Sequence, residues 1–140
     1  MIRPFQKDDL SAVMRIWLDT NIAAHSFLPE EYWRDNYQTV KELIPQAEVY
    51  VYSSANQIAG FIGLTDEYIA GLFVREDAQS KSIGKQLLNH AKSLRPSLRL
   101  SVYQKNVRAV RFYIREKFTV QSENLDSSTN ETELTMVWNK

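Results

Sequence analysis

The clearest chemical feature of the sequence is the polar loop QSKSIGK, residues 79–85, which leads from a strand-like segment into an amphipathic helix. A loop that ends at a helix N-terminus offers unpaired backbone N–H groups and the positive end of the helix dipole, which together favour an anion such as phosphate. No acidic residue occurs between Asp77 and Lys105. The loop side chains that donate hydrogen bonds or carry positive charge are Gln79, Ser80, Lys81, Ser82 and Lys85. We therefore predict an anion-binding loop, and note that an ordinary solvated helix start shows the same pattern.

The composition argues against several other kinds of site. The chain has no cysteine, which excludes disulfides, a thiol nucleophile and thiolate metal ligands. Its two histidines, His25 and His90, lie far apart in the sequence and lack the nearby carboxylates that metal sites use. We expect no metal centre.

Charge is unevenly distributed although the chain is neutral overall. Residues 1–70 carry five Lys or Arg against ten Asp or Glu, whereas residues 71–140 carry twelve against seven. The asymmetry fits a second half that holds an anion and a first half that presents acid to a cationic partner, and it fits solvated helix faces equally well. Because a lysine-rich run and a basic stripe with interleaved aromatics are both missing, the anion is not expected to be a nucleic acid.

Length and hydropathy limit the number of domains that the chain can form. With 140 residues and 44% apolar content, the chain is long enough for one domain with a real core and too short for two ordinary ones. We expect a single domain over residues 1–140. The longest apolar stretch, residues 58–64, is far shorter than the ~20 residues of a membrane span, and the start MIRPFQKDD lacks the apolar segment of a signal peptide. A cytoplasmic protein without membrane contact is the expectation.

Hydrophobic periodicity predicts a series of strands and helices. A short strand at 2–5 and two helices come first, and period-two segments at 47–54, 57–65 and 67–74 then indicate an antiparallel meander. The loop and its helix follow. The remaining elements are a strand at 98–103, a helix from about 107 to 116, and strands at 118–122 and 131–139, with the polar segment 122–132 interpreted as a long loop. The predicted order is β-α-α-β-β-β-α-β-α-β-β, an α/β or α+β sheet domain.

Two separated segments resemble the signatures of one enzyme family. LFVREDAQSKSIGKQLL, residues 72–88, is similar to the acetyl-CoA signature of the GNAT superfamily of N-acetyltransferases, Q/R-x-x-G-x-G/A after a strand. SVYQKNVRAVRFYIREKF, residues 101–118, resembles the second signature, N-x-x-A-x-x-F-Y followed by Gly-Phe. The segments AAHSFL, YWRD and VYQKN further resemble the small bacterial acetyltransferases of the YiaC and YjaB kind. The resemblance implies a GNAT-like mixed, mostly antiparallel central sheet flanked by helices.

The resemblance also implies which residues hold acetyl-CoA. The backbone of the strand ending at Val74 would pair with the pantetheine arm, and the loop from Gln79 to Gly84 would hold the pyrophosphate. Asn106 would bind on the pantetheine side, and Tyr113 would lie by the thioester sulfur. The full implied set is Leu72, Phe73, Val74, Gln79, Ser80, Lys81, Ser82, Ile83, Gly84, Lys85, Asn106, Ala109, Phe112 and Tyr113. Taken alone, Asn106 also fits a helix N-cap and Tyr113 a buried aromatic residue.

Two positions depart from the family pattern. The first glycine of the loop signature is Ser82 here, and the glycine before Phe118 is Lys117. Serine keeps the backbone N–H that an anion needs, but a side chain at a position of positive φ costs on the order of 1 kcal/mol. Lys117 would carry a similar cost at a helix C-cap. Both changes bear on cofactor affinity, and neither removes a reacting group.

Acetyl transfer to an amine needs a neutral nucleophile and a proton for the departing thiolate. A lysine amine, with a pKa of ~10.4, is neutral in roughly one molecule in a few thousand at pH 7, so its deprotonation needs assistance. Tyr113, with a reference pKa of ~10, stays protonated at neutral pH and can act as general acid. For the general base we consider Glu67 first, beside Asp66 between two strands, and His25 second. The segment TDEY, residues 65–68, is also typical of an ordinary polar turn.

The leading functional hypothesis is an acetyl-CoA-dependent N-acetyltransferase that moves an acetyl group directly to a primary amine, either a lysine side chain or a polyamine-like acceptor. Acetyl-CoA is a co-substrate in this interpretation, and the protein is a monomer, or a homodimer through an exposed strand edge. The alternatives are a non-catalytic CoA-binding or sensing domain and a protein-interaction domain on the same fold. The expected acceptor contacts, whose aromatic members also fit core positions, are His25, Phe27, Tyr32, Trp33 and Tyr68.

Overall fold

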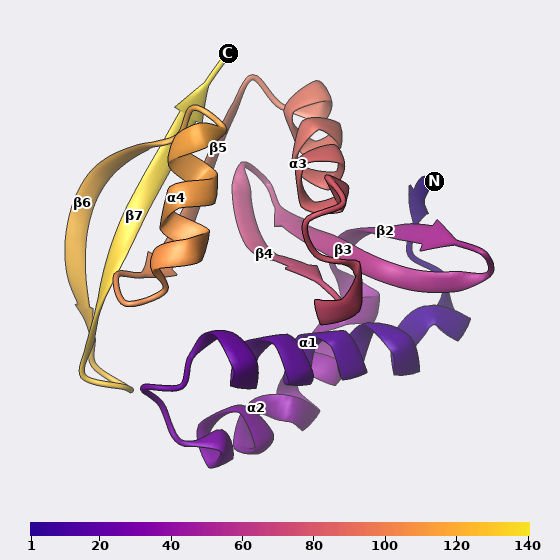
Figure 1. The fold of residues 1–140 in the computed structure, drawn as a ribbon, viewed down its shortest axis with the longest axis horizontal. Helices are drawn as coiled ribbons and strands as arrows, with labels where there is room; N and C mark the ends of the chain where they lie inside the picture. The colour runs from indigo at the N-terminus through magenta and orange to yellow at the C-terminus, as the bar shows by residue number, and fades with distance from the viewer.

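A seven-stranded sheet forms the middle layer of the molecule, and two helices cover each of its faces (Figure 1). The computed structural model describes residues 1–140. Its order of elements confirms the predicted order and the GNAT-like fold class. The elements are β1 (Ile2–Pro4), α1 (Leu10–Ala24), α2 (Glu30–Leu43), β2 (Glu48–Ser54), β3 (Gln57–Thr65), β4 (Tyr68–Val74), α3 (Ile83–Leu94), β5 (Ser97–Tyr103), α4 (Val107–Arg115), β6 (Thr119–Asp126) and β7 (Glu131–Asn139). None of the helices has the length and apolar character that crossing a membrane requires.

The strand order is β1-β2-β3-β4-β5-β7-β6, and every neighbouring pair is antiparallel except β4 and β5. That parallel pair is joined by the crossover helix α3, as parallel strands require. It is also very short, because only Tyr68 with Arg99 and Ile69 with Leu100 are paired. Beyond these two pairs the strands separate, and the sheet divides into an arm of β1–β4 and an arm of β5–β7 (Figure 1).

A β-bulge marks the point of separation. On the β3 side, Gly63 pairs with Gly71 and Leu64 pairs with Ile69, which leaves Ala70 as the extra residue of β4. A bulge bends its strand and increases the local twist. Because the bulge follows directly after the last residue of β4 that pairs with β5, it turns the end of β4 away from β5.

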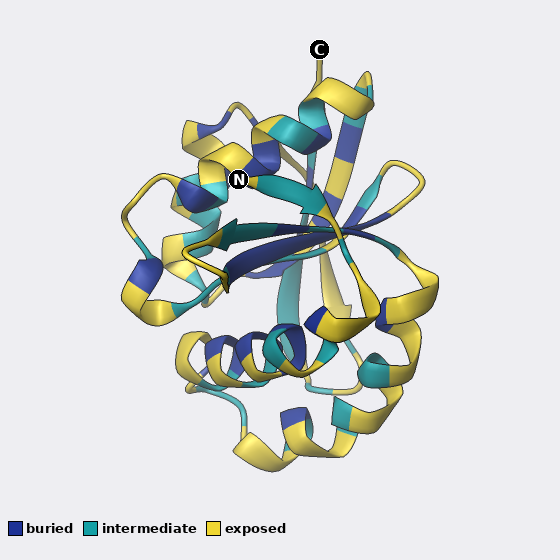
Figure 2. Cartoon of the chain, turned by 90° about the vertical axis from the view of Figure 1, so that its right-hand side faces the viewer, coloured by how far each residue is buried: buried dark blue, intermediate teal, exposed yellow.

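Two hydrophobic cores hold the layers together, one on each face of the sheet. The larger core packs α3 and α4 against the sheet and includes the fully buried Leu87, Leu88 and Met136. The smaller core packs α1 and α2 against the opposite face around Met14 and Phe61. Figure 2 shows the buried inner strands between helices whose outer surfaces are exposed. The larger core includes strands of both arms, so it also holds the two arms of the sheet together.

The polar segment 122–132 was predicted to be a long loop, and this prediction was wrong. β6 continues to Asp126 and β7 begins at Glu131, so only a tight turn separates them. β6 pairs with β7 alone, and almost all of its residues are exposed. An edge strand with both faces in solvent needs no apolar alternation, so its polar sequence lacks the pattern by which strands are recognised.

Lys117, one of the two departures from the family pattern, lies at the end of α4. Lys117 has φ 77°, which is the left-handed conformation that a helix C′ position usually gives to glycine. The Phe118 N–H donates to Tyr113 O at 2.9 Å, and the rings of these two residues pack edge to face with centroids 5.5 Å apart. This is a Schellman motif with its hydrophobic contact, built on a residue that has a Cβ.

We expect Lys117→Gly to raise the free energy of unfolding by about 1 kcal/mol, because glycine adopts the left-handed conformation without the Cβ penalty. Urea denaturation followed by circular dichroism would measure the change. The control is Lys117→Ala, which removes the same charge but keeps Cβ and should not stabilise. Equal stabilisation by both variants would show that charge, rather than backbone strain, is the cost at this position.

Candidate active site

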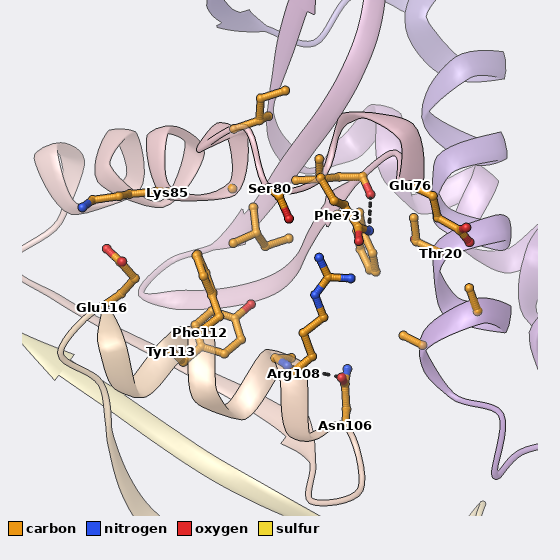
Figure 3. A pocket seen from close by; sticks show the side chains of 18 of the residues that line it. Thr20, Phe73, Glu76, Ser80, Lys85, Asn106, Arg108, Phe112, Tyr113 and Glu116 are labelled. Carbon is orange, nitrogen blue, oxygen red and sulfur yellow. Dashed lines mark hydrogen bonds between the residues drawn. The ribbon is translucent and has the colours of Figure 1, made fainter.

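A cleft of about 1170 Å³ lies where the two arms of the sheet separate. Its walls are the end of β4, the loop before α3 with the first turn of that helix, α4 with the connection that precedes it, and the C-terminal turn of α1. Figure 3 shows side chains from these segments pointing toward one another across the cleft. The cleft brings together nearly all the residues that the two signatures imply, although they are far apart in the sequence.

The β4 wall presents strand edge to the cleft. Leu72, Phe73 and Val74 all line it, and they pair with β3 on their other side. Because β5 has diverged at this level, this edge of β4 has no strand partner and is free to bind an extended ligand. One acceptor there is already used, since the side-chain amide of Gln79 donates to Val74 O at 2.9 Å. Gln79 therefore ties the loop to the end of β4.

The loop presents backbone donors to the cleft at the start of α3. The first hydrogen bond of the helix runs from Gln86 N to Ser82 O, so the N–H groups of Ile83, Gly84 and Lys85 have no backbone partner. Gly84 lines the cleft, and a Cβ at this position would lie 3.6 Å from both Val74 and Phe112. A side chain there would fill the space beside the free N–H groups. The arrangement is that of an anion site at a helix N-terminus.

The α4 wall carries four predicted residues on one helical face. Asn106 is the N-cap of α4, and its Oδ1 accepts a hydrogen bond from Ala109 N at 3.3 Å. Asn106, Ala109, Phe112 and Tyr113 all line the cleft. The Tyr113 hydroxyl makes no hydrogen bond within the protein and points into the cleft (Figure 3). Burial of the ring raises the pKa of Tyr113, so its hydroxyl remains protonated at neutral pH.

The charge of the cleft is positive. The five cationic residues that line it, against the two acids Glu76 and Glu116, are Lys85, Lys105, Arg108, Arg115 and Lys117. Arg108 extends from α4 toward Phe73 and Ser80 on the opposite wall (Figure 3). Lys105, Arg108 and Arg115 were not predicted from the sequence, although Lys105 and Arg108 precede Phe112 at helical spacing. Lys81, which was predicted, is exposed and does not line the cleft.

Two other predicted residues lie away from the cleft. Glu67 is exposed in the turn before β4, at the opposite end of that strand from Val74, and its carboxylate accepts a hydrogen bond from Ser97 Oγ at 2.9 Å. Tyr68 lies under the guanidinium of Arg99, 5.0 Å from the ring centroid. Neither residue lines the cleft. Glu67 as general base and Tyr68 as an acceptor contact thus remain predictions that the position of the cleft does not support.

The remaining acceptor candidates gather around His25. His25 lines the cleft, but its ring is buried among aromatic side chains: it stacks on Trp33 with centroids 5.0 Å apart and meets the edges of Phe27 and Tyr103. Trp33 belongs to the smaller core, and Phe27 and Tyr32 pack against it. None of these three lines the cleft. The structure thus favours the core interpretation for Phe27, Tyr32 and Trp33.

Comparison with known proteins decides the family. The family model described as "Acetyltransferase (GNAT) domain" matches residues 21–133. The chain belongs to this family. It is 32% identical over 122 residues to the peptidyl-lysine N-acetyltransferase YiaC of Escherichia coli, a match that covers 86% of this chain and 84% of YiaC. The two resemblances that the sequence suggested, to the GNAT superfamily and to proteins of the YiaC and YjaB kind, are confirmed.

Solved structures agree with this assignment. The solution structure of apo-form YjaB from Escherichia coli superposes with a TM-score of 0.88 at 27% identity, over 99% of this chain and 96% of YjaB. An aminoglycoside 6′-N-acetyltransferase in complex with coenzyme A superposes with a TM-score of 0.74 at 13% identity, over 99% of this chain and 96% of the other, which shows the same fold. This protein is accordingly a GNAT acyltransferase.

The GNAT loop signature contains strained backbone in this chain. Ser82, where the family uses glycine, has φ 66°, and Ser80 has φ 65°. Both residues line the cleft, and Ser82 is the N-cap of α3 without a side-chain capping bond. The backbone thus keeps the conformation that glycine would adopt freely, at a cost in folding free energy.

We expect Ser82→Gly to raise the free energy of unfolding by about 1 kcal/mol, because it relieves the left-handed strain and removes no hydrogen bond within the protein. Thermal and urea denaturation would measure it, with Ser82→Ala as a matched control that keeps Cβ and loses only the hydroxyl. A destabilised Ser82→Gly would mean that the serine side chain contributes more to this loop than its backbone strain costs.

Proposed function

We propose that this GNAT protein is an acetyl-CoA-dependent N-acetyltransferase that transfers the acetyl group directly to a primary amine, with a lysine side chain as the acceptor class. The observation that carries the proposal is the Tyr113 hydroxyl: a protonated donor without a partner in the protein, facing the cleft of an acetyltransferase fold. A domain that only binds CoA or a protein partner has no use for a proton donor at that position.

The cleft suits the successive parts of acetyl-CoA. The pyrophosphate fits the N-terminus of α3, where the N–H groups of Ile83, Gly84 and Lys85 are free and no Cβ at Gly84 obstructs the approach. The five surrounding cations suit a ligand with several phosphate charges. The pantetheine arm, which carries two amide groups, fits along the unpaired edge of β4 from Val74 to Leu72. This order brings the thioester end toward the inner part of the cleft.

The proposed chemistry is a single displacement. The neutral amine attacks the thioester carbonyl, a C–N bond forms, the C–S bond breaks, and Tyr113 gives its proton to the sulfur. Solvent or the acceptor nitrogen then returns a proton to the phenolate. The burial that raises the pKa of Tyr113 also raises the proton affinity of a thiolate formed beside it, so the transfer does not require a strongly acidic phenol.

Two observations support a lysine as the acceptor. YiaC, which is 32% identical to this chain, is named a peptidyl-lysine N-acetyltransferase. The first half of the sequence, which includes α1 and α2, carries ten acids against five cations and so favours the approach of a cationic acceptor.

Charge reversal in the cleft tests the cofactor site. Lys85→Glu should raise the dissociation constant for acetyl-CoA at least tenfold, because it replaces attraction with repulsion at the proposed phosphate position. Lys81→Glu is the control, because it changes the net charge by the same amount but lies outside the cleft. It should have a much smaller effect on the dissociation constant. Isothermal titration calorimetry at fixed ionic strength would measure both. Equal effects would place the phosphates elsewhere, and no binding by the wild type up to millimolar acetyl-CoA would refute the proposed donor.

Removal of the Tyr113 hydroxyl tests the chemical step. We expect Tyr113→Phe to lower kcat by about 100-fold with little change in the KM for acetyl-CoA, since the phenol is required at sulfur rather than for binding. The assay would follow thiol release with lysine-containing peptides and polyamines as acceptors. Tyr50→Phe is the control, because the Tyr50 hydroxyl donates to Glu48 at 2.7 Å away from the cleft. Unchanged turnover in Tyr113→Phe would exclude its role as general acid.

A further inference from the structure

His25 connects the two walls of the cleft through side-chain hydrogen bonds. It lies at the C-cap of α1, and its Nε2 lies 3.3 Å from Nδ2 of Asn106, the N-cap of α4. These residues are 81 positions apart in the sequence. Their contact lies across the region where β4 and β5 have separated, so it helps to set the distance between the α1 and α4 sides of the cleft.

The neighbouring groups fix the orientation of both side chains. Ala109 N is a donor, so the atom of Asn106 that faces it must be the oxygen, and the amide nitrogen must face His25. The amide N–H donates, so His25 Nε2 must carry a lone pair. Asn21 O, 3.0 Å from His25 Nδ1, can only accept, so Nδ1 must carry the proton. The histidine is therefore neutral and in a single tautomer.

Packing holds the ring in this state. The exposed fraction of His25 is 9%, and rings from the α1–α2 connection, α2 and β5 enclose it. Burial lowers the pKa of His25, which agrees with the neutral tautomer. The titratable groups nearby are the Tyr103 hydroxyl from β5, Tyr32 from α2 beyond Trp33, and Lys105, whose Nζ lies over the ring of Phe27. The lowered pKa comes from burial, and no charged neighbour contributes to it.

Both ring nitrogens of His25 are thus already engaged, which argues against its use as the general base. Asn106, in contrast, uses one N–H on His25 and its oxygen on Ala109, and keeps one N–H free. Asn106 lines the cleft together with His25 and Tyr113. Its free N–H can donate to a carbonyl of a ligand in the cleft.

We infer that His25 is a positioning residue, which accepts one N–H of Asn106 and thereby directs the other N–H to an amide carbonyl of the pantetheine arm. The inference rests on the proposed function for the identity of the ligand. If the Asn106 amide rotated, its oxygen instead of its N–H would face Nε2 of His25. Neutral Nε2 prevents this because it can only accept a hydrogen bond. His25 thus acts on donor binding and not on the proton transfers.

A set of four variants tests the role through the dissociation constant for CoA, measured by calorimetry, and through kcat and KM. His25→Phe keeps an aromatic ring but removes the acceptor, and it should weaken CoA binding about fivefold to tenfold with kcat at saturating acetyl-CoA within about twofold of wild type. His25→Gln restores an acceptor near Nε2 and should recover most of the affinity. Asn106→Ser keeps an N-cap oxygen but lacks the amide, so adding His25→Phe to it should cause no further loss.

The pH dependence gives an independent readout. Protonated His25 would present an N–H to the N–H of Asn106, so CoA affinity of the wild type should fall as the pH falls through the lowered pKa of His25. The phosphates of CoA also titrate near pH 6, but His25→Gln shares that effect and should lack the additional decline. Thermal denaturation of each variant would establish that it is folded.

The outcomes separate this inference from the proposed function. If wild-type protein fails to bind CoA, the proposed function fails. If wild-type protein binds and His25→Phe binds equally well, only the positioning role is overturned. A loss of kcat by orders of magnitude in both His25 variants, with unchanged CoA affinity, would overturn it as well and would identify His25 as the general base. Additive losses in the double variant would show that His25 does not act through Asn106.

Discussion

The site depends on the early separation of β4 and β5. Two residue pairs join these parallel strands, and the bulge at Ala70 then turns β4 away. An unpaired strand edge inside a protein normally exposes polar groups without partners, which is costly unless solvent or a ligand satisfies them. Here the edge becomes one wall of a cleft, with a helix N-terminus at its end. The same divergence that weakens the middle of the sheet thus creates backbone donors and acceptors for an extended ligand.

The larger core holds the two arms together across this opening. It is continuous over both arms, because it joins Ile62 of β3, Leu100 of β5 and Met136 of β7 with residues of α3 and α4, so the arms do not depend on the central pair alone. Contacts at the rim limit how far the arms can move apart: Asn106 with His25, Tyr32 with Ser128, and Lys105 over Phe27. Lys92 from α3 also donates to the carbonyl of Glu116 at the end of α4 at 2.6 Å. The cleft is therefore a preformed space whose walls are fixed from both ends.

Function and stability compete within the cleft. Left-handed residues with side chains occur at Ser80, Ser82 and Lys117, all of which are part of the cleft or its rim. Five cations gather around it with two acids, although like charges repel one another in the absence of an anion. Tyr113 leaves its hydroxyl without a partner. Each feature costs folding free energy in the free protein, as expected for an active site, and the proposed polyanionic thioester would offset that cost on binding.

The order of elements, the family and the residues of the two signatures could be predicted from the sequence, because periodicity, turn chemistry and motif spacing are local properties. The sequence predicted β6 only as far as residue 122, because the polar remainder of this exposed strand carries no alternation, and it placed Glu67 and Lys81 in a site that neither residue lines. The reach of Arg108 across the cleft and the hydrogen bond between His25 and Asn106 depend on the packing of the whole chain. Such contacts join segments that are remote in sequence, and their distance is set by how the two cores pack the helices against a divided sheet, which no local pattern encodes.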